Sequence, residues 1–183
     1  GWINASDLSR IDNRIEAVQK VLNEKYNNQE RISVYVKQLD MDRVAAINDE
    51  KSMYAASVAK LGVLYYAQER LSQKKLSLSD EYQYTSAVNG FPGAYDPDGS
   101  GKISKMPDDK NYSLENLLKA VAQNSDNVAT NILGYYVTNQ YDKAFQKSVD
   151  KAAATSWNMD KKELTARAAG TLMEAVYRQN GDI

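Results

Sequence analysis

A serine and a lysine three positions apart, Ser57 and Lys60, could together do covalent chemistry. Residues at this spacing lie on one face of a helix, and Ser57 opens a strongly apolar stretch typical of a buried helix. A lysine whose pKa is lowered by burial can accept a serine proton, and the N–H groups at a helix start can stabilise the resulting oxyanion. The pair therefore predicts a serine nucleophile activated by an amine.

The same spacing recurs at Ser72 with Lys75 and at Ser148 with Lys151, in polar surroundings that we interpret as solvated helix ends. The ordinary alternative for Ser57 is a helix-capping serine followed by a lysine that extends to solvent. Only Ser57 opens an apolar helix, and this context makes it the candidate.

A second polar cluster, Ser125-Asp126-Asn127, lies where a loop enters another apolar helix. Its ordinary alternative is a polar helix cap. A Ser-x-x-Lys motif followed by Ser-Asp-Asn is, however, the order found in enzymes that form acyl-serine intermediates.

Composition narrows the chemistry further, because the 183 residues include no histidine and no cysteine. Ser-His-Asp and Cys-His catalysis, disulfides and the usual zinc sites are excluded. The net charge of −1 gives no field that favours nucleic acid or an anionic membrane. We therefore expect a hydroxyl nucleophile, no metal, no organic cofactor and no nucleic-acid partner.

Hydrophobic periodicity indicates a mixed α+β fold made mostly of helices. The only convincing strands form one hairpin, which is marginally stable alone. We therefore expect a single domain over residues 1–183 that is incomplete at its C-terminus, with the N-terminal helix and hairpin in 5–56 and a mainly helical part in 57–183. The expected elements are a helix from about residue 8, after the capping pair Ser6-Asp7, to 26, strands at 32–37 and 44–47 around a turn at 40–42, and helices at 57–71, from 114, at 126–137 and at 165–177. A long loop is expected at 86–112, and loops of this length are usually functional or disordered.

Several segments in order resemble the penicillin-recognising serine hydrolases, and among them the class A β-lactamases. The resemblance implies a β-lactamase/transpeptidase-like fold, with a helical part beside an antiparallel sheet. It is carried by MYAASVAK at residues 53–60, the Gly-Ser-Gly-Lys-Ile turn at 99–103, YSLENLLKAVAQNSDNVATNIL at 112–133 and TARAAGTLMEAVY at 165–177.

The resemblance also implies residue roles. Ser57 would be the acylated nucleophile, and its N–H would form one half of the oxyanion hole. Lys60 would accept its proton directly or through a relay, and Ser125 would pass a proton to the leaving nitrogen. Asn127 would hold Lys60 and bind the substrate amide, while Asp126 would anchor its own loop.

The chain departs from this family pattern in two places. It has no Lys-Thr-Gly or Lys-Ser-Gly, so the strand that carries this motif and the second oxyanion N–H is expected beyond Ile183, in a remainder of the protein or a separate chain. The only glutamate between Tyr141 and Thr165 is Glu163, outside the family's Glu-x-x-Leu-Asn pattern. Without a deacylating base, an acyl-enzyme would persist, which favours a penicillin-binding protein over an efficient β-lactamase.

The loop at 86–112 contains a competing motif, because Asp96 and Asp98 begin a calcium-loop spacing. Its twelfth position is Pro107 in place of glutamate, and the Gly-Ser-Gly-x-Ile part fits the hydrolase resemblance equally well. In the same loop, Phe91 or Tyr95 could form a wall of the cleft near the nucleophile.

The sequence therefore predicts a serine hydrolase that forms an acyl-Ser57 intermediate with β-lactams or D-alanyl peptide-like amides. The alternatives are a D,D-peptidase with slow deacylation and a non-catalytic relative that binds envelope peptides. The expected partners are a small-molecule β-lactam or a peptidoglycan stem peptide, and the expected location is extracellular or in the bacterial cell envelope. No run of the sequence is apolar enough to span a membrane, and its first residues do not form a signal peptide.

Overall fold

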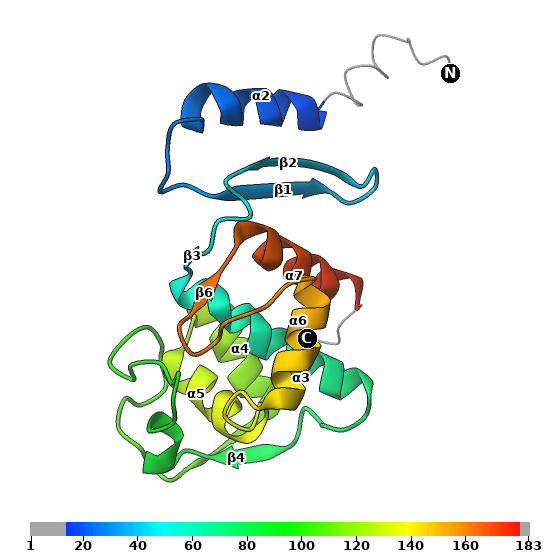
Figure 1. Cartoon of the computed structure of the whole chain (residues 1–183). Helices are drawn as coiled ribbons and strands as arrows, with labels where there is room; N and C mark the ends of the chain where they lie inside the picture. The colour runs from blue at the N-terminus through cyan, green and yellow to red at the C-terminus, as the bar shows by residue number, and fades with distance from the viewer. Residues whose placement is uncertain (1–13, 180–183) are drawn as a thin grey trace.

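The computed structural model describes residues 14–179 and has a mixed α+β fold. Figure 1 shows helix α2 and the β1–β2 hairpin above a larger helical body, with α7 between them. The elements of the upper part are α2 (Arg14–Tyr26), β1 (Val34–Gln38) and β2 (Arg43–Ile47).

Helix α2 covers one face and one edge of the hairpin. Its Ile15 and Leu22 are buried in a small core with Ala45 and Ile47 of β2. Its Gln19 accepts a hydrogen bond from the N–H of Ala46 and donates one to the carbonyl of Ala46. The outer edge of β2 is thereby closed, whereas in the described residues β1 pairs with β2 alone.

The helical body is built around α3, which lies in the main hydrophobic core. Tight packing on this helix is visible at Gly62, where an added Cβ would lie 3.1 Å from the indole nitrogen of Trp157. The helices are α3 (Leu61–Ser72), α4 (Leu114–Asn124), α5 (Asn127–Tyr136), α6 (Lys143–Ala153) and α7 (Ala166–Arg178), and a 3₁₀ turn at Ala56–Lys60 leads into α3.

Helix α7 joins the two parts. The ring of Tyr35 on β1 packs directly on Gly170, where an added Cβ would lie 2.3 Å from a ring carbon. Arg167 and Glu174 of α7 form ion pairs with Asp49 and Lys37 of the hairpin region. The hairpin therefore lies between α2 and α7, which explains why neither of its faces is fully exposed.

Two further antiparallel pairs, β3 (Met53–Tyr54) with β6 (Glu163–Leu164) and β4 (Glu81–Gln83) with β5 (Asn111–Ser113), correct the expectation that no strand follows the hairpin. Strands of two or three residues are too short to show a hydrophobic period. Helix α6 was likewise not among the expected helices, although Ser148 and Lys151, which lie in it, were interpreted as part of a helix end. The mixed α+β class is confirmed, and the hairpin and the other expected helices lie within a few residues of their predicted bounds.

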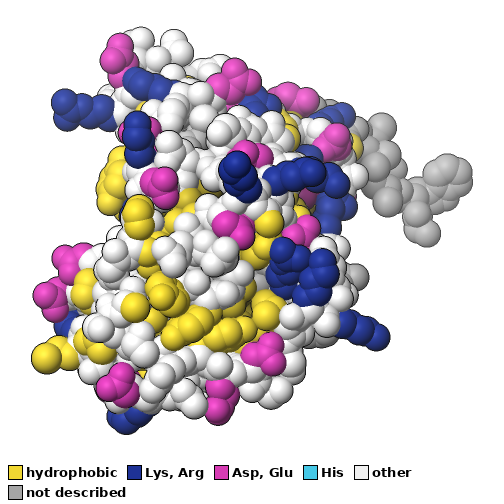
Figure 2. All heavy atoms as spheres, turned by 60° about the horizontal axis from the view of Figure 1, so that its bottom comes forward, with side chains coloured by type: hydrophobic (Ala, Val, Ile, Leu, Met, Phe, Trp, Pro, Cys, Tyr) yellow, Lys and Arg dark blue, Asp and Glu magenta, His cyan; other side chains and the backbone are white. Residues whose placement is uncertain are grey.

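The expected beginning of the first helix, before residue 14, and residues 180–183 lie outside the described residues. Between residues 14 and 179, no helix has both the length and the apolar character needed to cross a bilayer. On the face drawn in Figure 2, acidic and basic side chains are interspersed.

Candidate active site

Ser57 lies in the 3₁₀ turn at Ala56–Lys60, where it is exposed. The turn is held from one side by the β3–β6 pair and by the N–H of Ala55, which donates to the carbonyl of Lys162 at 2.8 Å. Ala56 has a φ of 46°, a left-handed conformation that costs a non-glycine residue about 1 kcal/mol or more. The backbone thus turns sharply just before Ser57 and presents it at the surface.

Lys60 is buried one turn further on, with only 3% of its surface exposed. Its Nζ donates to the carbonyl of Ser125 at 2.5 Å, to Ser125 Oγ at 3.1 Å and to Asn127 Oδ1 at 2.6 Å. Burial lowers the pKa of Lys60 to about 8, although the nearby Asp126 acts in the opposite direction. An amine of this pKa can be present in its neutral, proton-accepting form near neutral pH.

The Ser-Asp-Asn cluster lies in the junction between α4 and α5. Ser125 ends α4 in a left-handed conformation, with a φ of 51°. Asp126 is fully buried and caps α5 by accepting from the N–H of Ala129. Its other oxygen accepts from the N–H groups of Lys102 and Ile103. Asp126 therefore anchors a turn of the long loop as well as its own helix.

Asn127 connects Lys60 to the same loop. Its Oδ1 accepts from Lys60, its Nδ2 donates to the carbonyl of Asp96 at 2.8 Å, and its N–H donates to the carbonyl of Ser100. The fit leaves no room for a side chain at position 99, because a Cβ on Gly99 would lie 2.3 Å from Asn127 Nδ2. This close approach explains the glycine in the predicted Gly-Ser-Gly turn.

The predicted residues Ser57, Lys60 and Ser125 line one groove of about 390 Å³, here named the Ser57 groove. Its other lining residues are apolar. Within residues 14–179 the Ser57 side chain has no hydrogen-bond partner, and Asn127 lies beside Lys60 without lining the groove. The arrangement combines an unpaired hydroxyl with a buried amine and a second hydroxyl that bonds to it.

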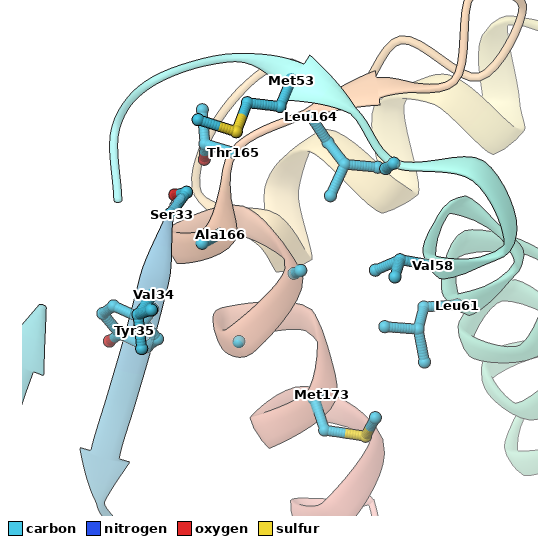
Figure 3. Close-up of a pocket in the computed structure, with 13 residues that line it drawn as sticks. Ser33, Val34, Tyr35, Met53, Val58, Leu61, Leu164, Thr165, Ala166 and Met173 are labelled. Atoms are coloured by element: carbon cyan, nitrogen blue, oxygen red, sulfur yellow. The ribbon is translucent and has the colours of Figure 1, made fainter. Parts of the chain in front are cut away.

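A larger apolar groove of about 540 Å³ adjoins the Ser57 groove and shares Val58, Leu61 and Met173 with it. Figure 3 shows Ser33, just before β1, with Val34 and Tyr35 of β1 on one side, Val58 and Leu61 on the other, and α7 with Ala166 and Met173 between them. The apolar groove thus runs along the edge of β1 that is not paired with β2.

The two aromatic residues expected as cleft walls do not line the Ser57 groove, which corrects that prediction. Phe91 is buried against Tyr135 and Tyr141 in the core. Tyr95 is also buried, and its ring lies under Lys60, with Nζ 4.7 Å from the ring centroid. The loop turns inward at Tyr95 because its N–H and carbonyl are bonded to the buried side chain of Asn131.

Lys162 also reaches this ring, although nothing in the sequence separated it from its charged neighbours. Its Nζ lies 4.4 Å from the Tyr95 centroid and donates to the carbonyl of Gly93 at 3.0 Å. Burial lowers the pKa of Lys162. Glu163, by contrast, is exposed in the short strand β6, opposite Tyr54, and forms no contact with Lys60 or Ser57.

The loop that carries Asp96 and Asp98 is organised by protein groups. The carbonyl of Asp96 accepts from Asn127, its carboxylate accepts from the N–H of Asp98, and the carbonyl of Asp98 accepts from Lys105. The described part of the chain contains no group of three histidine, cysteine, aspartate or glutamate residues placed to hold a metal ion.

Comparison with known proteins gives a family. The model of the "Beta-lactamase enzyme family" matches residues 13–182, which is most of the chain. No curated protein sequence matches significantly.

Solved structures share the fold at low sequence identity. "Structure of PBP-A" matches with a TM-score of 0.70 at 14% identity over 90% of this chain and 62% of that chain. A β-lactamase from Sphaerobacter thermophilus matches with a TM-score of 0.66 at 16% identity, over 89% of this chain and 62% of that one. The D-alanyl-D-alanine carboxypeptidase DacD from Francisella tularensis matches with 0.63 at 17% identity, over 81% and 37%. The chain thus spans less than two thirds of the length of these relatives.

Proposed function

Because this chain belongs to the β-lactamase enzyme family, we propose that it provides the nucleophile of a serine hydrolase that acts on β-lactams or D-alanyl peptide-like amides. The observation that carries the proposal is the buried amine of Lys60, held by Ser125 and Asn127, in a groove that the unpaired Ser57 also lines. Such amides belong to the bacterial cell wall and to the drugs that mimic it, so the proposed location is outside the cell or in its envelope. The reaction as proposed needs no cofactor.

Acylation starts from the neutral amine, which with a pKa of about 8 is present in about a tenth of molecules at pH 7. The Oγ–H bond of Ser57 breaks as Lys60 Nζ takes the proton, directly or through Ser125. Oγ bonds to the carbonyl carbon, and an electron pair moves to the carbonyl oxygen. The Ser57 N–H, at the start of its helical turn, stabilises that oxyanion.

Collapse of the tetrahedral intermediate breaks the carbon–nitrogen bond. The leaving nitrogen takes the proton of Ser125 Oγ, which is replaced from the Lys60 ammonium 3.1 Å away. The products are an acyl ester on Ser57 and a free amine, and Lys60 is neutral again. Asn127 keeps Lys60 in place and binds the substrate amide.

A second oxyanion donor is needed, and we propose that it arrives on a strand with a Lys-Thr-Gly or Lys-Ser-Gly motif, from a further part of the protein or from a separate chain. The apolar groove supports this. Tyr35 faces Ala46, whose N–H and carbonyl bond to Gln19 on the far side. In an antiparallel ladder, when the N–H and carbonyl of one residue point away from the partner strand, those of the residue directly opposite also point away. The N–H and carbonyl of Tyr35 are therefore free to pair with a strand in the apolar groove. In the assembled protein, slow hydrogen exchange of the Tyr35 amide is expected, and fast exchange would contradict a paired edge.

We propose slow deacylation, which favours a D,D-peptidase or penicillin-binding protein over an efficient β-lactamase. The supporting observation is the position of Glu163. It lies in β6, where it pairs with Tyr54 of β3, and it contacts neither Ser57 nor Lys60. An acyl ester without a base to activate water hydrolyses slowly.

Labelling with a fluorescent penicillin on a denaturing gel tests the function, with the parent and every variant in the assembled form that includes the strand proposed to carry the second oxyanion donor. We expect covalent label on the parent protein, none on Ser57→Ala, and full label on Ser72→Ala. Ser72 is a matched control because it belongs to a second Ser-x-x-Lys motif and bonds only to the carbonyl of Glu69. A folded parent that takes no label would favour the non-catalytic relative, and equal label on Ser57→Ala would refute the nucleophile. Rapid nitrocefin turnover would contradict slow deacylation.

A further inference from the structure

Tyr95 contacts the two segments on which acylation depends. The face of its ring lies 4.7 Å from the amine of Lys60, and its hydroxyl donates to the carbonyl of Ala56 at 3.2 Å. Ala56 is the strained residue directly before Ser57. One side chain therefore touches both the proposed base and the backbone that presents the nucleophile.

The position of Tyr95 is itself rigidly held. Its N–H donates to Asn131 Oδ1 at 2.7 Å, and its carbonyl accepts from Asn131 Nδ2 at 2.8 Å. Asn131 is fully buried in α5, and Tyr95 is only 7% exposed. These two bonds fix the backbone of Tyr95 on α5, and the bond from its hydroxyl to Ala56, together with burial, holds the ring beside Lys60.

The ring of Tyr95 also lies where it can stabilise a positive charge on Lys60. Lys60 becomes an ammonium each time it accepts the proton of Ser57, in a buried site where only neutral oxygens bond to it. An aromatic face within about 6 Å of a cation stabilises it, most strongly where water is excluded. Within residues 14–179, the other charged groups near Lys60 are Asp126, which caps α5, and Lys162, whose amine also contacts the Tyr95 ring. Burial raises the pKa of Tyr95, so the phenol stays neutral and cannot serve as a base.

We propose that Tyr95 is a positioning residue for acylation, whose ring stabilises the protonated state of Lys60 and whose hydroxyl fixes the backbone before Ser57. The proposal rests on the proposed function, which it deepens.

The ring is tested by a readout that needs no activity. The pKa of Lys60 is measured by NMR of ¹³C-labelled lysine, with Lys60→Arg to assign the signal. Tyr95→Leu is expected to lower this pKa by about one unit, the size of a lost cation–π contact. Phe91→Leu is the matched control, because Phe91 is equally buried in the same loop and has no contact with Lys60. An unchanged or raised pKa in Tyr95→Leu, or an equal fall in Phe91→Leu, would overturn the ring's role.

The hydroxyl is tested by Tyr95→Phe, which keeps the ring. Acylation by the fluorescent penicillin is expected to slow about fivefold, the effect of losing one ordinary hydrogen bond, with the pH midpoint unchanged. A rate equal to that of the parent would overturn this part, as would a shifted midpoint. Failure of the parent, assembled with the strand that carries the second oxyanion donor, to acylate would refute the proposed function, while the NMR measurement would still decide whether Tyr95 sets the pKa of Lys60.

Discussion

Replacing Gly99 by alanine is expected to damage the site through one side-chain contact. The added Cβ would lie 2.3 Å from Asn127 Nδ2 and 3.2 Å from the carbonyl of Asp96. Ordinary van der Waals contact requires at least 3.4 Å, so the amide of Asn127 must move by about 1 Å. The backbone of Asn127 is held by Ser100 and cannot follow, and the movement separates Oδ1 from Lys60.

The magnitude follows from these contacts. Overpacking of this kind costs about 1–3 kcal/mol, and a chain of this size loses about 2–4 °C of melting temperature for each kcal/mol. A misplaced hydrogen-bond partner of the base is expected to slow acylation by at least tenfold. Stability is measured by thermal unfolding. The acylation rate is measured by quenching the reaction with fluorescent penicillin at a series of times.

Gly90→Ala is the matched control, because its Cβ would lie 3.7 Å from the nearest atom and its φ of −104° suits any residue. We expect Gly90→Ala to shift the melting temperature by no more than about 2 °C and to leave the acylation rate unchanged. If Gly99→Ala acylates as fast as Gly90→Ala, Asn127 does not set the position of Lys60 and the reasoning is wrong.

Four further outcomes follow from the site. Acylation should rise with pH and level off above about 8, because only neutral Lys60 accepts the proton; a rate independent of pH from 6 to 9 would exclude it as the base. The same depressed pKa means that the ammonium is disfavoured in the folded state, so the free energy of unfolding should rise between about pH 8 and 10.5, an effect that Lys60→Met should abolish in urea titrations. Asp126→Asn should lower the free energy of unfolding by about 1–3 kcal/mol, because an amide nitrogen would face backbone N–H groups that now donate to the carboxylate. An unchanged urea midpoint would contradict the role of Asp126 in holding the loop. Glu163→Gln should leave the lifetime of the acyl ester unchanged, whereas a longer lifetime would identify Glu163 as the deacylating base.

The sequence was sufficient for the parts of the site that are local. The Ser57–Lys60 spacing and the apolar helix that follows it predicted a buried lysine, and Lys60 is buried. The glycines of the turn at 99–101 were noted for the family resemblance, but their physical reason is the contact of Gly99 with Asn127 and of Gly101 with Asp126. That reason involves residues more than 20 positions apart and cannot be read from a pattern.

Other features depend on tertiary contacts that leave no local trace. Tyr95 was predicted, with Phe91, as a possible wall of the cleft because nothing in the sequence fixes the path of the loop, but Asn131 bonds to its backbone and holds it in the core. Helix α6 buries Phe145 and Val149 on a single narrow face. The lysines between these apolar residues made their helical spacing hard to recognise in the sequence. Lys162 came near the site only because β6 pairs with β3.

The bonds from Asp126 to Lys102 and Ile103 also have a consequence for dynamics. The loop between β4 and β5 has little regular structure, yet two of its amides end on a buried carboxylate that also caps α5. Opening the loop would therefore uncap the helix, and the two should unfold as one cooperative unit. The amides of Lys102, Ile103 and Ala129 should exchange with solvent deuterium at a common free energy of opening, close to that of a helix and far above that of a free loop.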